Sequence, residues 1–318
     1  MNLWKMTALA SLVISTGVLA ATETTTVQQT GIGNHAVTQQ GLLTQPATNS
    51  TTSIYQVNGA NANDAYTTQL ATNSSISVTQ QLGHDNQVGS AASPFTQTGG
   101  HNDTTIVQSG SFNKVTAPSS AVQGGNYNSL TVLQTGNNNN ATPTQNSGAF
   151  NTTLVTQTGN NDQATTAQYG SFNTTIVTQS PVGGGAGASG NDNTATTSQT
   201  GLGNYANVQQ TGSSGGNGNL NGGVDVTQVG LGNSATTKQD DWGGETDVQQ
   251  YGAFHTASVV QNSPSNAANG YSHADLIQTG FANNATITQN YGIVGGPVAA
   301  NAYVTQGGSF NYANVTQN

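Results

Sequence analysis

The chain contains no cysteine and no arginine, and its three lysines are Lys5, Lys114 and Lys238. Without cysteine, no disulfide can hold the fold, so regular backbone pairing is the obvious substitute. Binding a phosphate backbone needs clustered Lys and Arg that displace counterions, and isolated lysines cannot supply this. We therefore expect no nucleic-acid partner.

Hydrophobic and charged residues are also scarce, at 33% and 5% of the 318 residues. Globular domains average about 45–50% and about 25%. This composition argues against a large apolar core. The polar residues are mainly Asn, Gln, Thr, Ser and Gly, which repel each other little and hydrogen-bond well, so ordered β-stacking remains open despite a net charge of −9.

The first 20 residues have the pattern of a secretory signal. Lys5 is followed by a mainly apolar run from Ala8 to Ala20 that ends in Val18-Leu19-Ala20. The alternative is a membrane anchor, but the run is shorter than the roughly 20 residues that span a bilayer. We therefore expect residues 1–20 to be cleaved, no membrane insertion, and a secreted chain of residues 21–318.

A repeat with a step of 11 residues organises the sequence after this segment. Two steps make a unit of about 22 residues, and counting Gln anchors gives about 23 strands in about 11 rungs. We assign these anchors to a structural ladder: Gln29, Gln40, Gln134, Gln145, Gln157, Gln168, Gln179, Gln199, Gln210, Gln228, Gln239, Gln250, Gln261, Gln278, Gln289, Gln306 and Gln317.

Each step has the pattern of a strand followed by a turn. Val, Ile or Thr stands two residues before each Gln, and Ala or Thr stands four before, so these side chains share the inward face of a strand. Gly and Asn follow at fixed places and are residues that accept positive φ in turns. Examples of these turn residues are Gly31, Asn34, Gly201, Asn204, Gly230 and Asn233. The pattern predicts an all-β fold, a β-solenoid with two strands per rung and amyloid-like cross-β stacking.

Extra residues fall mainly in alternate steps, such as Gln80 to Gln97 and Gln261 to Gln278, whereas Gln97 to Gln108 keeps 11 residues. A coil with two edges explains this, because one edge can extend its loops while the other stays tight. Gln40 to Gln56 is the main exception.

Three units match Gln-x-Gly-x-Gly-Asn-x-Ala-x-x-x-Gln at every specified position: Gln29 to Gln40, Gln199 to Gln210 and Gln228 to Gln239. This pattern resembles the curlin repeat of curli fibre subunits, and the resemblance covers nearly all of residues 21–318. It implies a secreted subunit that self-assembles into extracellular amyloid fibres on a bacterial surface, for adhesion, cell aggregation and biofilm matrix. The implied partners are further copies of the chain, a nucleator subunit and curli-type secretion and chaperone proteins. Whether the chain would be the bulk or the nucleating subunit stays open.

The repeat also suggests how copies would join. Stacked rungs lie about 4.8 Å apart, so identical side chains form columns, and a buried Gln column satisfies its amides only when stacked. The sequence shows no capping segment beside the array. We expect Ala313, Val315 and Gln317 to point inward on the last strand, whose free edge is the predicted polymerising edge.

No catalytic or metal-binding constellation is recognisable, so we expect no enzyme activity, cofactor or metal. We interpret the scattered histidines as solvated turn residues: His35, His84, His101, His255 and His273. The acidic cluster Asp240, Asp241, Glu245 and Asp247 is interpreted as disfavouring premature stacking.

Two other functions stay open at this stage. One is a monomeric secreted β-solenoid that binds ice or a glycan through a flat Thr-rich face, and the other is a carbohydrate-active enzyme. Several Phe residues, including Phe172, Phe254 and Phe310, directly precede the turn Asn position. They would pack against adjacent filaments or surfaces, or they would only cover the local turn.

Overall fold

A computed structural model describes residues 23–41, 49–57, 59–117, 122–180, 193–211, 223–240, 244–262, 272–290 and 300–317. The predicted signal segment 1–20 lies outside the described residues. The described residues form strands and turns and contain no helix. The all-β class predicted from the sequence is therefore confirmed.

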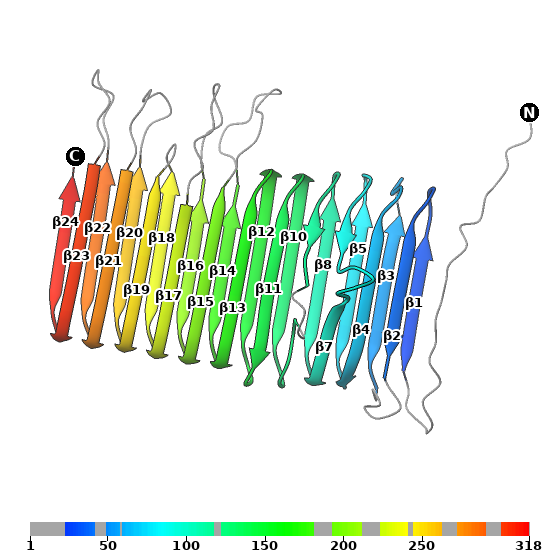
Figure 1. The fold of residues 1–318 in the computed structure, drawn as a ribbon, viewed down its shortest axis with the longest axis horizontal. Helices are drawn as coiled ribbons and strands as arrows, with labels where there is room; N and C mark the ends of the chain where they lie inside the picture. Colours follow the sequence, from blue (N-terminus) through cyan, green and yellow to red (C-terminus); the bar gives the residue numbers. More distant parts are fainter. Residues whose placement is uncertain are drawn as a thin grey trace, which may run out of the picture. The chain divides into compact units, whose positions relative to one another are not determined.

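The chain divides after Asn146 into two compact units. In each unit, consecutive strands alternate between two parallel sheets, apart from β6 and β7, which lie in the same sheet, so the chain coils with two strands per turn. Figure 1 shows this in each unit as arrows of one sheet pointing up the page and arrows of the other pointing down. Each unit is a β-solenoid, as the repeat predicts.

In the first unit, one sheet has the strand order β1-β3-β5-β8-β10 and the other has the order β2-β4-β6-β9-β11, with β7 also paired to β4. Their bounds are β1 Thr24–Gln29, β2 His35–Gln40, β3 Thr51–Val57, β4 Asp64–Thr72, β5 Ser75–Gln81, β6 Gln87–Val88, β7 Phe95–Gly100, β8 Asp103–Ser109, β9 Lys114–Val115, β10 Ser129–Asn137 and β11 Asn140–Ser147.

In the second unit, one sheet has the order β12-β14-β16-β18-β20-β22-β24 and the other has the order β13-β15-β17-β19-β21-β23. Their bounds are β12 Thr152–Asn160, β13 Gln163–Ser171, β14 Thr174–Gln179, β15 Thr194–Leu202, β16 Tyr205–Gln210, β17 Gly223–Leu231, β18 Ser234–Asp240, β19 Glu245–Ala253, β20 Thr256–Asn262, β21 Ser272–Phe281, β22 Asn284–Asn290, β23 Ala300–Ser309 and β24 Tyr312–Gln317.

The strand count differs slightly from the prediction. The described ranges hold 24 strands, because the step from Gln80 to Gln97 contains both β6 and β7. Both of these strands pair with β4 and together take the place of one strand of the sheet. The residues between them, 89–94, interrupt that strand. The expectation that extra residues extend an edge loop is wrong for this step. The insertion lies within the strand rather than at its end.

The core of each solenoid is narrow and made of small, β-branched and amide side chains. In β17, Val224, Val226 and Gln228 are buried, whereas Asp225 and Thr227 lie on the outer face. This alternation follows from the period of two in a strand. A shift of one residue would turn every buried side chain outward, so the pattern fixes the register of each strand.

A column of glycines occupies the second-last residue of each strand of one sheet in the second unit, where the chain enters the turn. Gly201 has φ +122°, and a Cβ atom there would lie 2.0 Å from the carbonyl oxygen of Gly230 on the next rung. Only glycine permits this approach of two backbones. The turn Gly predicted from the repeat is thus required twice, by its φ and by the rung above it.

Candidate functional site

The Gln anchors lie in continuous columns inside each unit, linked from rung to rung by side-chain hydrogen bonds of 2.5–3.0 Å between Nε2 and Oε1. In the first unit the columns are Gln29-Gln56-Gln80-Gln108-Gln134 and Gln40-Gln69-Gln97-Gln123-Gln145. In the second unit they are Gln157-Gln179-Gln210-Gln239-Gln261-Gln289-Gln317 and Gln168-Gln199-Gln228-Gln250-Gln278-Gln306.

All of these hydrogen bonds run in one direction along the chain. Nε2 of Gln228 donates to Oε1 of Gln250 (2.7 Å) and to the backbone oxygen of Tyr205 in the facing sheet (2.9 Å). A backbone oxygen can only accept, so the amide nitrogen must face it, and this fixes which way the amide points. The same arrangement recurs at Gln80, Gln199 and Gln278. Each rung therefore donates to the rung that follows it in sequence.

Threonine hydroxyls from the facing sheet donate a second hydrogen bond to Oε1 of several ladder Gln residues. Oε1 of Gln199 accepts from Nε2 of Gln168 (3.0 Å) and from Oγ1 of Thr175 (2.8 Å). Thr104 and Thr246 make the same contact with their own facing Gln. The repeat predicts Thr in this column but does not indicate its partner. The sequence feature that could have identified this contact is Thr in place of Ala four residues before an anchor. Of the two, only Thr can donate a hydrogen bond to the second lone pair of the amide oxygen.

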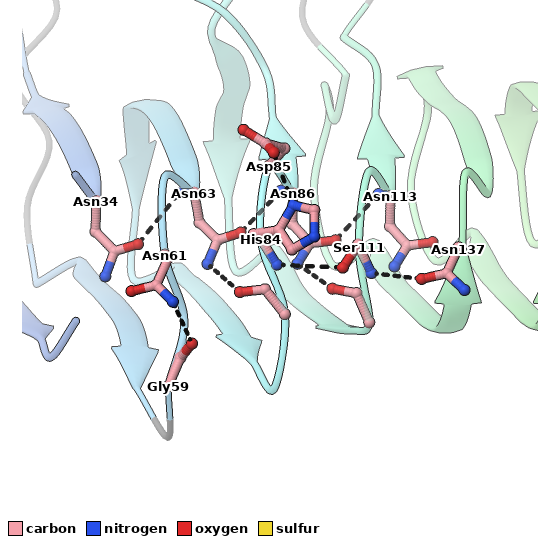
Figure 2. A network of polar contacts seen from close by, with 12 residues as sticks. Asn34, Gly59, Asn61, Asn63, His84, Asp85, Asn86, Ser111, Asn113 and Asn137 are labelled. Carbon is pink, nitrogen blue, oxygen red and sulfur yellow. Dashed lines mark hydrogen bonds and ion pairs between the residues drawn. The ribbon is translucent and has the colours of Figure 1, made fainter. Parts of the chain in front are cut away.

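The turn Asn residues form a second ladder (Figure 2). The backbone N–H of Asn86 donates to Oδ1 of Asn63 (2.8 Å), and Nδ2 of Asn86 donates to the backbone oxygen of Gly110 on the next rung (2.6 Å). Asn113 continues the column by donating its N–H to Oδ1 of Asn86 (3.0 Å). Each Asn thus binds the following rung both as donor and as acceptor.

This result corrects the role assigned to the turn Asn residues. Asn34, Asn204 and Asn233 are buried and do not have positive φ. The residue before each of them, such as Gly203 or Gly232, carries the positive φ instead. Asn is used at this position because its short side-chain amide reaches the next rung. The predicted turn glycines Gly31, Gly201 and Gly230 do have positive φ, as the turn pattern suggests.

His255 occupies the Asn position of its rung and is fully buried, so its interpretation as a solvated histidine is wrong. Its backbone N–H donates to Oδ1 of Asn233 (3.1 Å), its Nδ1 accepts from the N–H of Asn283 (3.2 Å), and its Nε2 contacts the backbone oxygen of Tyr251 (3.1 Å). His273 likewise lies in strand β21 rather than in a turn. Among the described residues, no group of three or more His, Asp or Glu side chains is placed to hold a metal ion.

Three aspartates align on the outer face of one sheet of the second unit: Asp225 pairs with Asp247, and Asp247 with Asp275. Burial raises the pKa of Asp225 above its ordinary value, and the charge of Asp247 raises it further. Burial and Asp247 also raise the pKa of Asp275, against a smaller lowering by His273. The loops between the strands hide this column in the sequence, because they make its spacing irregular.

The outermost rung of the second unit leaves part of both ladders unfilled. Nε2 of Gln306 donates to the oxygen of Asn284 (3.0 Å), and Nε2 of Gln317 donates to the oxygen of Asn301 (2.9 Å). Within the part of the chain that the structure describes, the second hydrogen of each Nε2 has no acceptor. Ala313, Val315 and Gln317 alternate inward in β24 but are only half-buried, because no described strand covers their outer side.

The first rung of the first unit leaves the opposite groups unfilled. Oε1 of Gln29 is buried, and no described residue donates to it. The backbone N–H bonds of the Asn ladders run the opposite way, since Asn63 donates to Oδ1 of Asn34 in the first unit and Asn311 donates to Oδ1 of Asn283 in the second. Among the described residues, the N–H of Asn34 and Oδ1 of Asn311 therefore have no Asn partner. In the Gln ladder, the last rung therefore offers amide donors and the first rung an amide acceptor, and in the Asn ladder these two roles are exchanged.

The described residues include no helix that is long and apolar enough to cross a membrane. A scan against protein-family models gives no match, and a search of the curated proteins gives no significant match.

Proposed function

We propose that this chain is a secreted structural subunit that self-assembles head to tail into curli-like extracellular amyloid fibres. The fibres would serve adhesion, cell aggregation and the cohesion of a biofilm matrix on a bacterial surface. The proposed partners are further copies of the chain, together with a nucleator subunit and curli-type secretion and chaperone proteins. The resemblance to the curlin repeat supports this proposal, and the solenoid supplies its mechanism.

The observation that carries the proposal is the one-way ladder with complementary ends. The steps Gln29 to Gln40 and Gln306 to Gln317 have the same length, and each consists of a strand, a tight turn and a strand. A second copy can therefore place its first step on the last step of the copy before it. This continues both sheets with the rung spacing of about 4.8 Å that stacked strands have.

In this arrangement β1 of the incoming copy lies on β23, and its β2 lies on β24. Gln306 then donates to Oε1 of the incoming Gln29, and Oδ1 of Asn311 accepts from the incoming N–H of Asn34. Each new contact repeats one that the solenoid makes internally, as between Gln278 and Gln306 and between Asn283 and Asn311. Growth needs no new kind of interaction, and it satisfies groups for which the described residues of one copy provide no partner.

The outer faces give less support to binding of ice or a glycan through a flat threonine array. One outward column of the second unit runs Ile176, Asn207, Thr236, Ser258 and Thr286. Such a mixed column offers no repeated spacing of hydroxyl groups.

The experiment is to release purified residues 21–318 from denaturant and to follow assembly with time. The proposal predicts β-rich fibres after a lag, because the ladder is costly to nucleate and easy to extend, and a meridional reflection at about 4.7–4.8 Å in fibre diffraction. A folded protein that stays monomeric at high concentration, or fibres without this reflection, would contradict it.

A further inference from the structure

One corner of the second unit carries an exposed apolar side chain on every rung. We define the corner ridge as Phe172, Leu202, Leu231, Phe254, Phe281 and Phe310, which are between 39% and 76% exposed. Backbone hydrogen bonds tie the successive turns together, as from Phe254 N to Leu231 O (2.8 Å) and from Phe310 N to Phe281 O (3.0 Å). The ridge thus follows the stacking direction of the rungs.

Three consecutive members of the ridge touch. The rings of Phe254 and Phe281 have centroids 5.5 Å apart, as do those of Phe281 and Phe310. A Cβ atom on Gly232 would lie 3.0 Å from the ring of Phe254, so this ring covers the glycine next to Leu231. The exposed side chains therefore form a strip, with rings in contact from Phe254 to Phe310 and with turns stacked by backbone hydrogen bonds from Phe172 to Leu231. Phe150 extends it by one rung, since it stacks on Phe172 at 4.9 Å.

Large apolar side chains recur in the ridge from rung to rung although several of them strain the backbone. Phe172, Phe254 and Phe310 have φ of +56° to +58°, a conformation that costs a residue with a Cβ atom about 1–2 kcal/mol. Where Gly203, Gly232 or Ala282 takes this position, the preceding residue is Leu or Phe instead. Each rung keeps one large apolar side chain at one of two adjacent positions. Local covering of the turn does not need this, since Asn138 and Asn161 make the equivalent turn without any apolar side chain.

The charge distribution favours a second copy as the occupant. None of the turn residues 169–173, 200–204, 229–233, 251–255, 279–283 and 307–311 is Asp, Glu, Lys or Arg. The acidic column of Asp225, Asp247 and Asp275 lies on a sheet face, and the whole chain carries a charge of −9. Two copies therefore repel each other across that face and meet without repulsion at the ridge. A partner must also repeat at the rung spacing to match every side chain, which another solenoid of this kind does.

The area of the corner ridge indicates whether single subunits or whole fibres would bind through it. Six side chains, each about half exposed, offer roughly 450–750 Å² per copy, using about 150–250 Å² for each fully buried large side chain. A stable pair of proteins buries about 800 Å² per partner. One chain falls short of this area, whereas a fibre presents one ridge for every copy and gains avidity from all of them.

We infer that the corner ridge is the surface through which assembled fibres bind one another side by side, and that free subunits do not pair through it. This inference rests on the proposed fibre function. It adds a lateral interface to the head-to-tail one and assigns it to residues that the ladders do not use.

The test compares wild-type fibres with those of a ridge variant, Phe172→Asn/Phe254→Asn/Phe310→Asn. Asn is suitable because Asn138 and Asn161 of this chain already adopt the same φ. The matched control, Tyr55→Thr/Tyr205→Thr/Tyr303→Thr, removes three aromatic residues from the outer sheet faces. Thr79, Thr174 and Thr196 already occupy the same outward columns. The readouts are mass per length and width of fibres by electron microscopy, the elongation rate from seeds, and sedimentation of unassembled subunits.

We expect wild-type and control fibres to have at least twice the mass per length of ridge-variant fibres, with elongation rates within twofold and monomeric subunits in all three. Equal mass per length in wild type and ridge variant would overturn the inference while leaving the fibre proposal intact. Single wild-type fibres that bind lipid vesicles or a polysaccharide through the ridge would also overturn it. Absence of fibres from the wild type would refute the polymer itself.

Discussion

The backbone N–H of Asn283 donates to Nδ1 of His255 across 3.2 Å, in the place where other rungs use an Asn oxygen. Because an N–H must meet an acceptor, Nδ1 is the acceptor of this hydrogen bond and Nε2 faces the oxygen of Tyr251. His255 therefore takes the acceptor role that Oδ1 of Asn has on the other rungs.

We predict that His255→Asn keeps the free energy of unfolding within about 1 kcal/mol of wild type, because Oδ1 of Asn accepts the same N–H on other rungs. His255→Leu removes the acceptor of the Asn283 N–H and should lower the free energy of unfolding by about 1–3 kcal/mol, the usual cost of an unsatisfied buried group. Denaturant unfolding of the two variants measures the difference. His101→Leu, at an exposed turn, serves as the control. Equal losses in His255→Asn and His255→Leu would show that the ring does not take the place of an Asn.

The aspartate column should make the stability of the solenoid depend on pH. Since burial, and then Asp247, raises the pKa of Asp225, the folded state favours its protonated form. This contribution is fully present below the ordinary value of 3.8 and is lost as the pH rises through the raised value. Asp225→Asn should therefore be more stable than wild type at neutral pH and equal to it near pH 3. Asp240→Asn removes one charge outside the column, and an equal gain in that variant would assign the effect to net charge instead.

Two buried threonines should be replaceable with a gain in stability. Oγ1 of Thr197 and Oγ1 of Thr237 are buried, and no partner for either lies within the described residues. Their column neighbours include Val226 and Val259, so valine fits the position. We predict that Thr197→Val and Thr237→Val each stabilise the solenoid by about 1 kcal/mol.

Thr175→Val is the matched opposite case, because Oγ1 of Thr175 donates to Gln199. It should destabilise by about 1–3 kcal/mol. Thermal unfolding of the three variants compares them directly, and the same sign of change in all three would contradict the assignment of the hydroxyl groups.

The two glycines of one turn should differ in tolerance. Gly201→Ala would place Cβ 2.0 Å from the oxygen of Gly230, so the rungs must separate, with a loss of several kcal/mol. Gly203 has φ +67°, and a Cβ atom there would meet open space, so Gly203→Asn should cost no more than about 1 kcal/mol. Unfolding midpoints of the two variants measure the difference. Equal midpoints would mean that the rung contact at Gly201 is not rigid.

Much of the fold could be predicted because two periods agree in the sequence. The alternation of Val226 and Gln228 with outward residues identifies the strand face, and the 11-residue step from Gln228 to Gln239 identifies the coil. The sequence could not distinguish an extended edge loop from an interrupted strand, as between β6 and β7. Both insert residues between the same two anchors, and only the pairing with β4 separates them.

The sequence predicts which residues form the Gln ladder, but it does not predict the direction of their hydrogen bonds. A Gln column is visible in the sequence, whereas the direction of its amides depends on backbone oxygens of the facing sheet, such as that of Tyr205. Burial of His255 was missed because histidine is usually exposed in turns, and its role depends on Asn233 and Asn283 from neighbouring rungs. These features come from stacking, so a single repeat does not contain them.

The central claim is that the outer edge of β24 receives the next copy, and seeded elongation with a blocked edge tests it most directly. Val315→Pro removes one backbone N–H, and Gln317→Lys puts an unpaired charge into the Gln column. The inner rungs stay intact, so the double variant should still fold. Added in modest excess to wild-type seeds, it should bind through its unchanged first rung and stop growth at that end. If wild-type seeds elongate at the same rate with and without the double variant, β24 is not the polymerising edge and the account is contradicted.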